Sequence, residues 1–378
     1  MKTETVKGFK DFTGEDAEKR TEVRKILIEV FEKYGFEPAE TPVVEYESFV
    51  KGDNSDDEAV SDIFKLKDRG KRKLALRYEL TFPLKRLIKN KKLPYKRYQI
   101  GEVFRDEPIS ANRFRQFTQC DADIIGSNIK DEAEIFALTK NVLKELGVEV
   151  VIYVGNRKLL NEILEEQGIK KNQEQVLREI DKLDKLSEKD VARNLKKLGA
   201  GKVLSVFKKK ESYFEKYEAY KDVAELKKFC SYYNVNVEFQ PSLVRGLSYY
   251  NGNVFEVKGK GIKETIAGGG SFMFNGIQST GISFGLDRLM NIVKIKNEKV
   301  KAMIISIGQD REAIKVAEKL RKKGEDCLIY YGKPSKALGF ANSKGIDRVI
   351  FVGKEEVKKG KFKEKDMVSG RTREIKIL

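Results

Sequence analysis

The segment RYQIGEVFRDEPISANRFRQFTQCDADIIG, residues 97–126, is the stretch that decides the fold. Apolar and polar residues alternate in two runs, and the polar stretch EPISANR at 107–113 separates them. An alternation with a period of two is typical of a β-strand that buries one face. The two runs therefore predict a long β-hairpin with a mobile polar loop.

Three arginines, Arg105, Arg113 and Arg115, flank this loop. Guanidinium groups stay charged and can hold phosphate oxygens through two parallel hydrogen bonds. The sequence contains neither a GxxxxGK[ST] nor a GxGxxG motif, so a bound nucleotide would need another phosphate-binding device, which these arginines could supply. Cations on an exposed hairpin edge also discourage aggregation, and the arginines alone favour this simpler interpretation.

Around the hairpin, the sequence predicts further elements of an α+β domain. Residues 15–34 have the periodicity of an amphipathic helix, and a strand is expected to follow through Pro42. Residues 131–147 predict a second helix, and the charged, glycine-poor stretch at about 156–237 predicts an inserted helical domain. Strand and glycine signals then return in LVRGLSYYNGNVFEV, IAGGGSFMFNG and GISFGLDRLMNIV, the last of which predicts a strand that runs into a helix.

The final segment has a different organisation. After a lysine-rich linker at 294–301, strand and helix signals alternate through residues 301–378, which favours a small α/β domain with a mainly parallel sheet. This segment holds 20 Lys or Arg and 11 Asp or Glu, so it carries over half of the +17 net charge of the 378-residue chain. A lysine-rich proteome could produce such an excess, but a polyanion such as nucleic acid is the first partner that it predicts.

The composition excludes several kinds of chemistry. The chain has no histidine, which removes Ser-His-Asp and Cys-His nucleophile schemes, imidazole bases and the commonest zinc sites. The remaining polar residues suit transfer at phosphorus, where positioning and charge stabilisation dominate. Cys120, Cys230 and Cys327 lie far apart without CxxC spacing, which predicts buried thiols. With neither a signal peptide nor an apolar run of membrane-spanning length, we expect a soluble cytoplasmic protein with no membrane contact.

Several blocks, in order along the chain, resemble the motifs of histidyl-tRNA synthetases. FRDE at 104–107 and RFRQFTQCDADIIG at 113–126 are similar to motif 2 of this class II family, particularly in its archaeal and eukaryotic form. The other similar blocks are KGFKDF at 7–12 (amino-terminal signature), ETPVVE at 40–45 (motif 1), LALRYELT at 74–81 (amino-acid-binding segment), LVRGLSYYNGNVFE at 243–256 (histidine-specific signature) and GISFGLDRL at 281–289 (motif 3). Residues 301–378 resemble the family's anticodon-binding domain.

The resemblance implies a fold with two domains. Residues 1–300 would form an α+β class II synthetase catalytic domain, an antiparallel sheet flanked by helices and interrupted by the helical insertion at about 156–237. Residues 301–378 would form a C-terminal α/β anticodon-binding domain. Motif 1 is the class II dimer element, so the resemblance also implies a homodimer.

The resemblance further implies which residues bind ATP. Arg105 would hold the α-phosphate and the carboxylate of the amino acid, and Glu107 would face the adenine. Arg288 would hold the γ-phosphate, with Arg113 as a further ATP-binding residue. Arg245 corresponds to the catalytic arginine, which neutralises the α-phosphate while the carboxylate of histidine attacks it.

Six residues would enclose the substrate histidine: Glu79, Thr81 and Gln119 at its ammonium group, and Asp123, Tyr249 and Tyr250 at its imidazole. Each also has a simpler interpretation. Glu79 could pair with Arg77, and Asp123 could end a strand. Adjacent tyrosines in a strand would point to opposite faces, so at least one would belong to the core.

Two segments depart from the family pattern. Ser248 stands where the family usually has Asp in LDYY, and AGGGSFMFNGI at 267–277 replaces a run similar to AGGGRYDGL. Phe272 in place of Tyr removes a hydroxyl near the expected histidine pocket. Gly268–Gly270 still allow a ligand to approach the backbone closely.

The implied function is that of a histidine–tRNA ligase. Histidine and ATP would give histidyl-adenylate and pyrophosphate, and a terminal ribose hydroxyl of tRNA(His) would then take the histidyl group. Mg2+ would accompany ATP and offset its charge. The sequence assigns no protein ligand to this metal.

Three alternatives to this ligase would each lack a feature that the resemblance implies for this sequence. A non-catalytic regulatory subunit, like the synthetase-like subunit of ATP phosphoribosyltransferase, would lack the anticodon domain. An RNA sensor derived from a synthetase would lose the adenylation residues. A class II enzyme for proline, threonine or glycine would lack the block at 243–256.

Overall fold

The computed structural model describes residues 3–52, 58–110, 113–184, 186–245, 249–260, 265–295 and 301–377. The chain divides into two compact units, residues 1–295 and 296–378, and each is described by itself. Among the described residues, no helix combines the length and the apolar character needed to cross a bilayer.

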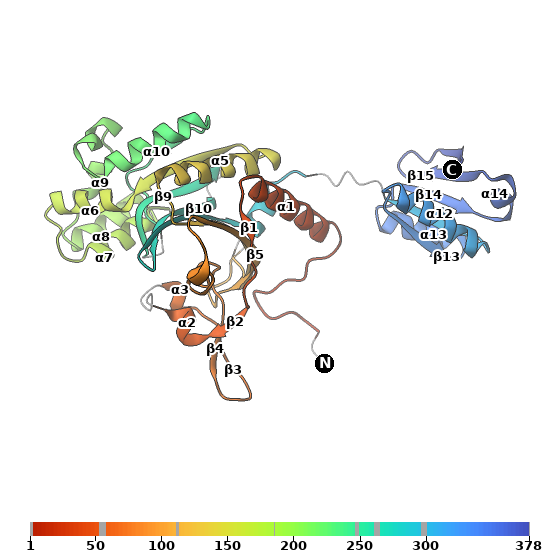
Figure 1. Ribbon diagram of the computed structural model, residues 1–378, viewed down its shortest axis with the longest axis horizontal. Coiled ribbons are helices and arrows are strands. Elements are labelled where there is room, and N and C mark those ends of the chain that lie inside the picture. The colour runs from red at the N-terminus through yellow and green to blue at the C-terminus, as the bar shows by residue number, and fades with distance from the viewer. Residues whose placement is uncertain are drawn as a thin grey trace. The chain divides into compact units, whose positions relative to one another are not determined.

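The first unit is built on an eight-stranded sheet with the order β1-β5-β6-β11-β10-β9-β7-β8 (Figure 1). Its strands are β1 (Glu37–Pro38), β5 (Tyr95–Phe104), β6 (Gln116–Ile125), β7 (Val150–Asn156), β8 (Val237–Phe239), β9 (Tyr250–Gly259), β10 (Thr265–Phe274) and β11 (Ile277–Gly285). The six central strands pair antiparallel, whereas the short edge strands β1 and β8 pair parallel with β5 and β7. The predicted antiparallel sheet is therefore confirmed, with a short parallel strand added at each edge.

The hairpin predicted at 97–125 is formed by β5 and β6, which pair from Tyr95 opposite Ile125 to Phe104 opposite Gln116. Cys120, Ala122 and Ile124 belong to the main hydrophobic core. Because side chains alternate along a strand, the intervening polar residues of β6 point away from this core. The hairpin thus presents a polar row on the opposite face of the sheet.

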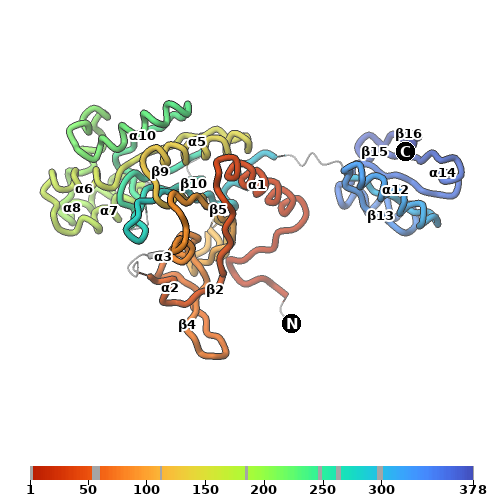
Figure 2. The backbone as a smooth tube through the Cα atoms, viewed as in Figure 1, coloured from red at the N-terminus to blue at the C-terminus, as the bar shows by residue number. Residues whose placement is uncertain are grey.

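Helices cover the core-facing side of the sheet, as the ribbon and the backbone trace show (Figures 1 and 2). They are α1 (Gly14–Lys33), α5 (Ile129–Glu145), α10 (Tyr220–Tyr232) and α11 (Leu286–Ile292). Val23, Leu27 and Phe31 recur at helical spacing on α1 and are fully buried. At the start of α5, Asn128 and Asp131 form a capping box. Both helices predicted on this side, at 15–34 and 131–147, are confirmed to within two residues.

The stretch predicted as a helical insertion is indeed helical. It contains α6 (Arg157–Glu166), α7 (Gln173–Asp181), η2 (Lys182–Asp184), α8 (Glu188–Lys197), α9 (Val203–Phe207), η3 (Glu211–Lys216) and α10. The helices from α6 to α9 enclose a core of their own, which Val244 joins. By contrast, Phe214 of η3 and Leu226 of α10 pack into the main core. The part with its own core is therefore shorter than the predicted insertion.

A small three-stranded sheet, with the order β2-β4-β3, precedes the hairpin. Its strands are β2 (Val44–Tyr46), β3 (Lys65–Lys67) and β4 (Lys73–Leu76), and the neighbouring helices are α2 (Glu47–Lys51), α3 (Glu58–Ser61), α4 (Leu84–Leu87) and η1 (Ile88–Asn90). The strand expected through Pro42 is not formed there, because Pro42 lies between β1 and β2 and has no N–H to donate to a neighbouring strand.

After β4 the chain lies against the polar face of β5. Arg97 donates a hydrogen bond from Nη2 to the carbonyl of Leu80 at 2.8 Å, and Arg77 donates from Nε to the carbonyl of Glu102 at 2.8 Å. These contacts place the segment 77–81 beside the hairpin.

The second unit has a five-stranded sheet with the order β13-β12-β14-β15-β16. Its elements are β12 (Ala302–Ser306), α12 (Asp310–Lys322), β13 (Cys327–Tyr331), α13 (Pro334–Ser343), β14 (Arg348–Val352), α14 (Lys354–Lys359), β15 (Phe362–Asp366) and β16 (Thr372–Ile375). The predicted parallel α/β arrangement is confirmed for β12, β13 and β14. The antiparallel hairpin of β15 and β16 adds to it. The expectation of buried thiols holds for Cys120 and Cys230, whereas Cys327 on β13 is half-buried.

Candidate active site

A cavity of about 840 Å3 lies on the polar face of the large sheet. All eleven candidate residues line it: Glu79, Thr81, Arg105, Glu107, Arg113, Gln119, Asp123, Arg245, Tyr249, Tyr250 and Arg288. They come from segments far apart in the sequence, which the sheet brings to one place. Ser248 lies outside the described residues.

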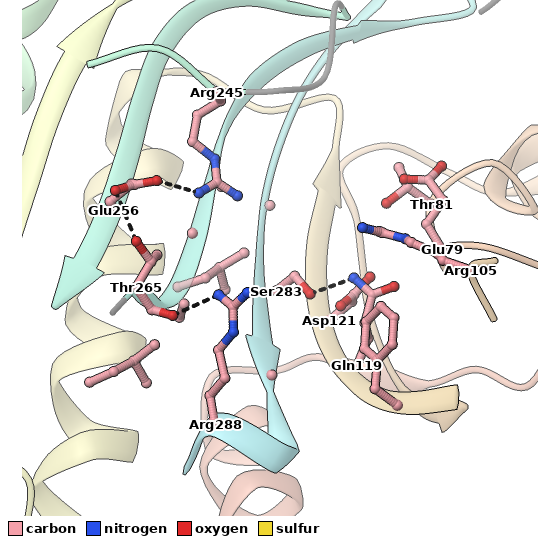
Figure 3. A pocket seen from close by; sticks show the side chains of 18 of the residues that line it. Glu79, Thr81, Arg105, Gln119, Asp121, Arg245, Glu256, Thr265, Ser283 and Arg288 are labelled. Atoms are coloured by element: carbon pink, nitrogen blue, oxygen red, sulfur yellow. Dashed lines mark hydrogen bonds and ion pairs between the residues drawn. The ribbon is translucent and has the colours of Figure 1, made fainter. Parts of the chain in front are cut away.

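Arg245 reaches the cavity from the segment that precedes β9 (Figure 3). Its Nη1 donates a hydrogen bond to Glu256 Oε1 at 2.7 Å, and its Nε has no partner within the described part of the chain. A Cβ at Gly268 would lie 2.5 Å from Nη1. Any larger residue at this position of the glycine run would displace the guanidinium, so Gly268 makes room for Arg245.

Arg288 points toward Arg245 from the start of α11 (Figure 3). Its Nη1 donates a hydrogen bond to the carbonyl of Thr265 at 2.8 Å. The pKa of Arg288, a partly exposed residue, is lowered first by the loss of hydration within the cavity, and then by the positive charges of Arg245, Arg113 and Arg105. Four guanidinium groups that repel one another in one cavity are suited to bind a ligand with several negative charges.

Two of the three hairpin arginines belong to this cavity. Arg105 donates from Nε to the carbonyl of Tyr78 at 3.1 Å, and its guanidinium lies 5.2 Å from the ring centroid of Phe117. Glu107 lies 3.7 Å from Arg105 and 3.8 Å from Arg113, measured between the charged atoms. Both arginines therefore line the cavity, although the side chain of Arg113 is half exposed. Arg115 instead pairs with Asp106 at 3.0 Å and does not line the cavity.

Another part of the cavity is acidic. Glu79, Asp121 and Asp123 are all buried, and burial is the largest cause that raises the pKa of each carboxyl group. The pKa of Glu79 rises to about 7, and that of Asp121 also rises to about 7, with the charge of Asp123 as its second cause. Arg97 opposes the shift at all three carboxylates.

The contacts of these carboxylates exclude the simpler interpretations given above. Glu79 accepts a hydrogen bond from the backbone N–H of Phe82 at 3.0 Å, whereas Arg77 donates to backbone carbonyls instead of pairing with Glu79. Asp123 lies inside β6, and its Oδ2 is 2.5 Å from Arg97 Nη2. The two form an ion pair by distance, although the hydrogen bond of that nitrogen goes to the carbonyl of Leu80.

Asp123 is further enclosed by the neighbouring strand β11. A Cβ at Gly281 would lie 1.9 Å from Asp123 Oδ1, so this carboxylate requires glycine opposite it.

Aromatic rings complete the acidic part. The ring centroids of Tyr249 and Tyr250 are 4.9 Å apart, and Phe272 lies 5.5 Å from Tyr249. The expectation that adjacent tyrosines point to opposite faces is wrong here, because β9 begins at Tyr250 and Tyr249 precedes it. Tyr249 also lies 3.5 Å from Glu79, measured from its hydroxyl to Oε2.

Several polar residues of the cavity were missing from the prediction, among them Asp121, Glu256, Thr265 and Ser283. Gln119 donates a hydrogen bond from Nε2 to Ser283 Oγ at 2.8 Å, and Thr265 donates to Glu256 Oε2 at 3.0 Å. The signal for Asp121 was available, since it lies between Gln119 and Asp123 with the same parity on one strand. The others depend on pairing between strands that the sequence does not reveal.

Comparisons with known proteins identify the family. Residues 8–289 match the histidyl-tRNA synthetase family, and residues 301–378 match the anticodon binding domain. A histidine–tRNA ligase 2 of Shouchella clausii is 34% identical over 97% of this chain and 96% of its own length. A histidine–tRNA ligase of the archaeon Methanocaldococcus jannaschii is 33% identical over 98% and 97%.

The fold agrees with this match. The crystal structure of a histidyl-tRNA synthetase from Nostoc sp. PCC 7120 aligns with a TM-score of 0.86 at 23% identity, over 100% of this chain and 97% of that one. The large sheet and the terminal unit thus agree with the two sequence matches, and the chain belongs to the histidyl-tRNA synthetase family.

Proposed function

We propose that the chain is an ATP-dependent ligase that joins L-histidine to tRNA(His) in the cytoplasm. One observation carries the proposal: a single cavity holds four arginines and, beside them, a pocket of buried carboxylates and tyrosines. The arginines suit a nucleotide, and the pocket suits a small ligand with positively charged and N–H groups. ATP–pyrophosphate exchange tests the proposal: histidine should support it, and proline, threonine and glycine should not.

In the first step, the carboxylate of histidine attacks the α-phosphate of ATP. Arg105 holds both reacting groups, and Arg245 faces the negative charge that develops at phosphorus. Arg113 and Arg288 bind the remaining phosphates, and Glu107 faces the adenine. The nucleophile is already ionised, so the step needs no general base, which fits a chain without histidine.

Mg2+ would arrive with ATP, as a substrate ion. Among the described residues, no three acidic or cysteine side chains form a group that could hold a metal by themselves. Mg2+ commonly keeps several waters and binds through substrate phosphates with one or two carboxylates. The lack of a group of three acidic side chains is therefore compatible with Mg2+ bound to ATP. When bound, the metal would offset phosphate charge.

The regulatory and RNA-sensor alternatives fit less well. The first would lack the terminal domain, which is present and matches the anticodon binding domain. The second would lose the adenylation residues, whereas Arg105, Arg245 and Arg288 all line the cavity. The altered run at 267–277 keeps Gly268, the residue that makes room for Arg245.

Asp123 is proposed to accept a hydrogen bond from the imidazole of histidine. A hydrogen bond to a charged group contributes about 1.5–3 kcal/mol, so Asp123→Ala should raise the KM for histidine roughly ten- to a hundredfold. The KM for ATP should stay near its starting value, which serves as the internal control. Asp123→Asn should recover little if the charge matters. An equal loss for both substrates would show that Asp123 supports the sheet instead.

A homodimer is proposed from the apolar surface of the small sheet. Val43, Val44, Tyr46 and Leu66 are 38–55% exposed there, although large apolar side chains are usually buried. A second copy of the chain would cover them through a two-fold contact. Light scattering of the unmodified protein should give the mass of a dimer.

Two matched variants distinguish the loss of this contact from a general loss of stability. Val44→Lys together with Leu66→Lys should shift the mass toward a monomer. Tyr232→Lys, which changes an exposed aromatic residue on α10, should leave it unchanged. A fully active monomeric wild type would contradict the proposal.

A further inference from the structure

The proposed histidine pocket has more acceptors than a neutral imidazole can use. Gln119 Oε1 and Asp121 Oδ1 are buried on one face of β6 and accept no hydrogen bond within the described part of the chain, whereas Asp123 Oδ2 on the same face lies 2.5 Å from Arg97 Nη2. A buried polar atom without a partner costs about 1–3 kcal/mol, so Gln119 Oε1 and Asp121 Oδ1 should each meet a donor when the substrate is bound. A neutral imidazole has one N–H group, whereas the protonated ring has two.

The charges of the pocket also favour a protonated imidazole ring. Glu79, Asp121 and Asp123 are three buried carboxyl groups; Arg97 opposes all three of their pKa shifts, and Arg105 also opposes that of Glu79. Arg77 is also nearby, but its electrostatic interactions with Glu102 and Glu45 are larger than that with Asp121. If all three carboxylates are ionised and Arg105 is balanced by the carboxylate of the bound histidine, two negative charges remain after Arg97. The ammonium group of histidine balances one, and a protonated ring would balance the other.

The spacing of the two aspartates suits such a ring. Asp121 and Asp123 are two residues apart on one strand, so their Cα atoms are on the order of 7 Å apart and their side chains lie on the same face. The two N–H groups of an imidazolium point away from each other, and acceptors at this spacing can receive one each. Tyr249, Tyr250 and Phe272 supply aromatic surface beside them.

We propose that Asp121 is a specificity-determining residue and that the pocket holds histidine as an imidazolium, with one ring N–H donated to Asp123 and the other to Asp121. The inference rests on the proposed function, which places the imidazole at Asp123. It adds the protonation state of the bound substrate and a second carboxylate that selects it.

The free protein can supply this proton only at lower pH. Asp121 faces Asp123 on its own strand, Arg97 on β5, Ser283 on β11, and Glu79 and Arg77 on the segment after β4. Burial and the charge of Asp123 raise its pKa to about 7, so below this pH the pair of aspartates holds a proton that the bound ring can take. Above it, neither the pair nor a free imidazole, with a pKa of about 6.5, carries this proton. Binding must then take it from solution.

Calorimetry of histidine binding at pH 8, in two buffers with different ionisation enthalpies, measures this proton directly. The unmodified protein should take up about one proton per histidine bound, and its affinity should fall by up to about tenfold per pH unit above pH 7. Asp121→Asn keeps the size of the side chain and removes its charge. This variant should bind histidine without proton uptake and with little dependence on pH. Glu145→Gln, at the exposed end of α5, is the control and should behave like the unmodified protein.

A histidine analogue with a fluorinated ring provides a second readout, because fluorine makes the ring a much weaker base. The unmodified protein should bind it at least about tenfold more weakly than histidine, and Asp121→Asn should lose most of this discrimination. Binding without proton uptake by the unmodified protein would overturn the proposal, and so would unchanged uptake by Asp121→Asn. Full histidine affinity in Asp123→Ala would instead show that the proposed location of the imidazole is wrong.

Discussion

Arg245→Ala should slow the formation of histidyl-adenylate by about 10^2–10^3-fold, the cost typical of removing a group that stabilises charge in a transition state. Arg245 lines the cavity with Arg105 and Arg288, and its Nε has no partner within the described part of the chain. The proposed contact strengthens only as charge develops at phosphorus, so the affinity for histidine should change much less than the rate. Single-turnover adenylate formation and equilibrium histidine binding measure the two effects separately.

A second variant distinguishes loss of this contact from simple repulsion. In Arg245→Ala the carboxylate of Glu256 loses its 2.7 Å partner and could repel the phosphate. Arg245→Ala combined with Glu256→Gln removes that charge as well. If Arg245 acts on the α-phosphate, the double variant should remain slow. Recovery to a near-normal rate would show that Arg245 mainly neutralises Glu256.

Local patterns predicted the main parts of the fold well. The alternation in 97–125 identified β5 and β6 because one face of each strand is buried against helices and the other faces the cavity. The helical periodicity of 15–34 identified α1 for a similar reason, since only one side of it meets the core. Such patterns indicate which face of a segment is buried, and they can be recognised in the sequence of that segment alone.

Features set by contacts between distant segments were harder to predict. The hairpin of β15 and β16 has a charged sequence, and its place is determined by pairing with β14. Likewise, Gly268 was expected to let a ligand approach the backbone closely. In the structure, the space left by its missing side chain is occupied by the guanidinium of Arg245, which lies 23 residues earlier in the sequence.

The site could be predicted from family motifs but its electrostatics could not. The motifs brought Glu79, Gln119 and Asp123 together, and the structure places all three in one cavity. The family motifs give Asp121 no role. Nothing in the sequence pattern singles out Arg97, because its importance comes from its contacts with Asp123 and Leu80. The balance of charge in the pocket depends on which charged side chains lie close together, and only the structure shows this.

Removing residues 296–378 should abolish measurable aminoacylation of tRNA(His) while ATP–pyrophosphate exchange stays within a few-fold of its starting rate. The cavity residues all belong to the unit 1–295, and the terminal unit has its own hydrophobic core around Ile304 and Ile350. The removed domain carries a large share of the positive charge, 20 Lys or Arg against 11 Asp or Glu within 301–378. Each phosphate contact that is lost should lower the salt dependence of tRNA binding by roughly 0.7–0.9 in the slope of log K against log salt.

The full-length variant Lys358→Gln with Lys359→Gln and Lys361→Gln provides the matched test, because it keeps the domain and removes three exposed charges. It should weaken tRNA binding, reduce the salt dependence and leave exchange unchanged. Truncation alone could fail because the shortened protein misfolds, so its exchange activity and its mass in solution must be measured together. If a folded, dimeric truncated protein lost exchange as completely as aminoacylation, adenylation would depend on the terminal domain. The proposed separation, with ATP at the cavity arginines and tRNA held by the basic domain, would then be wrong.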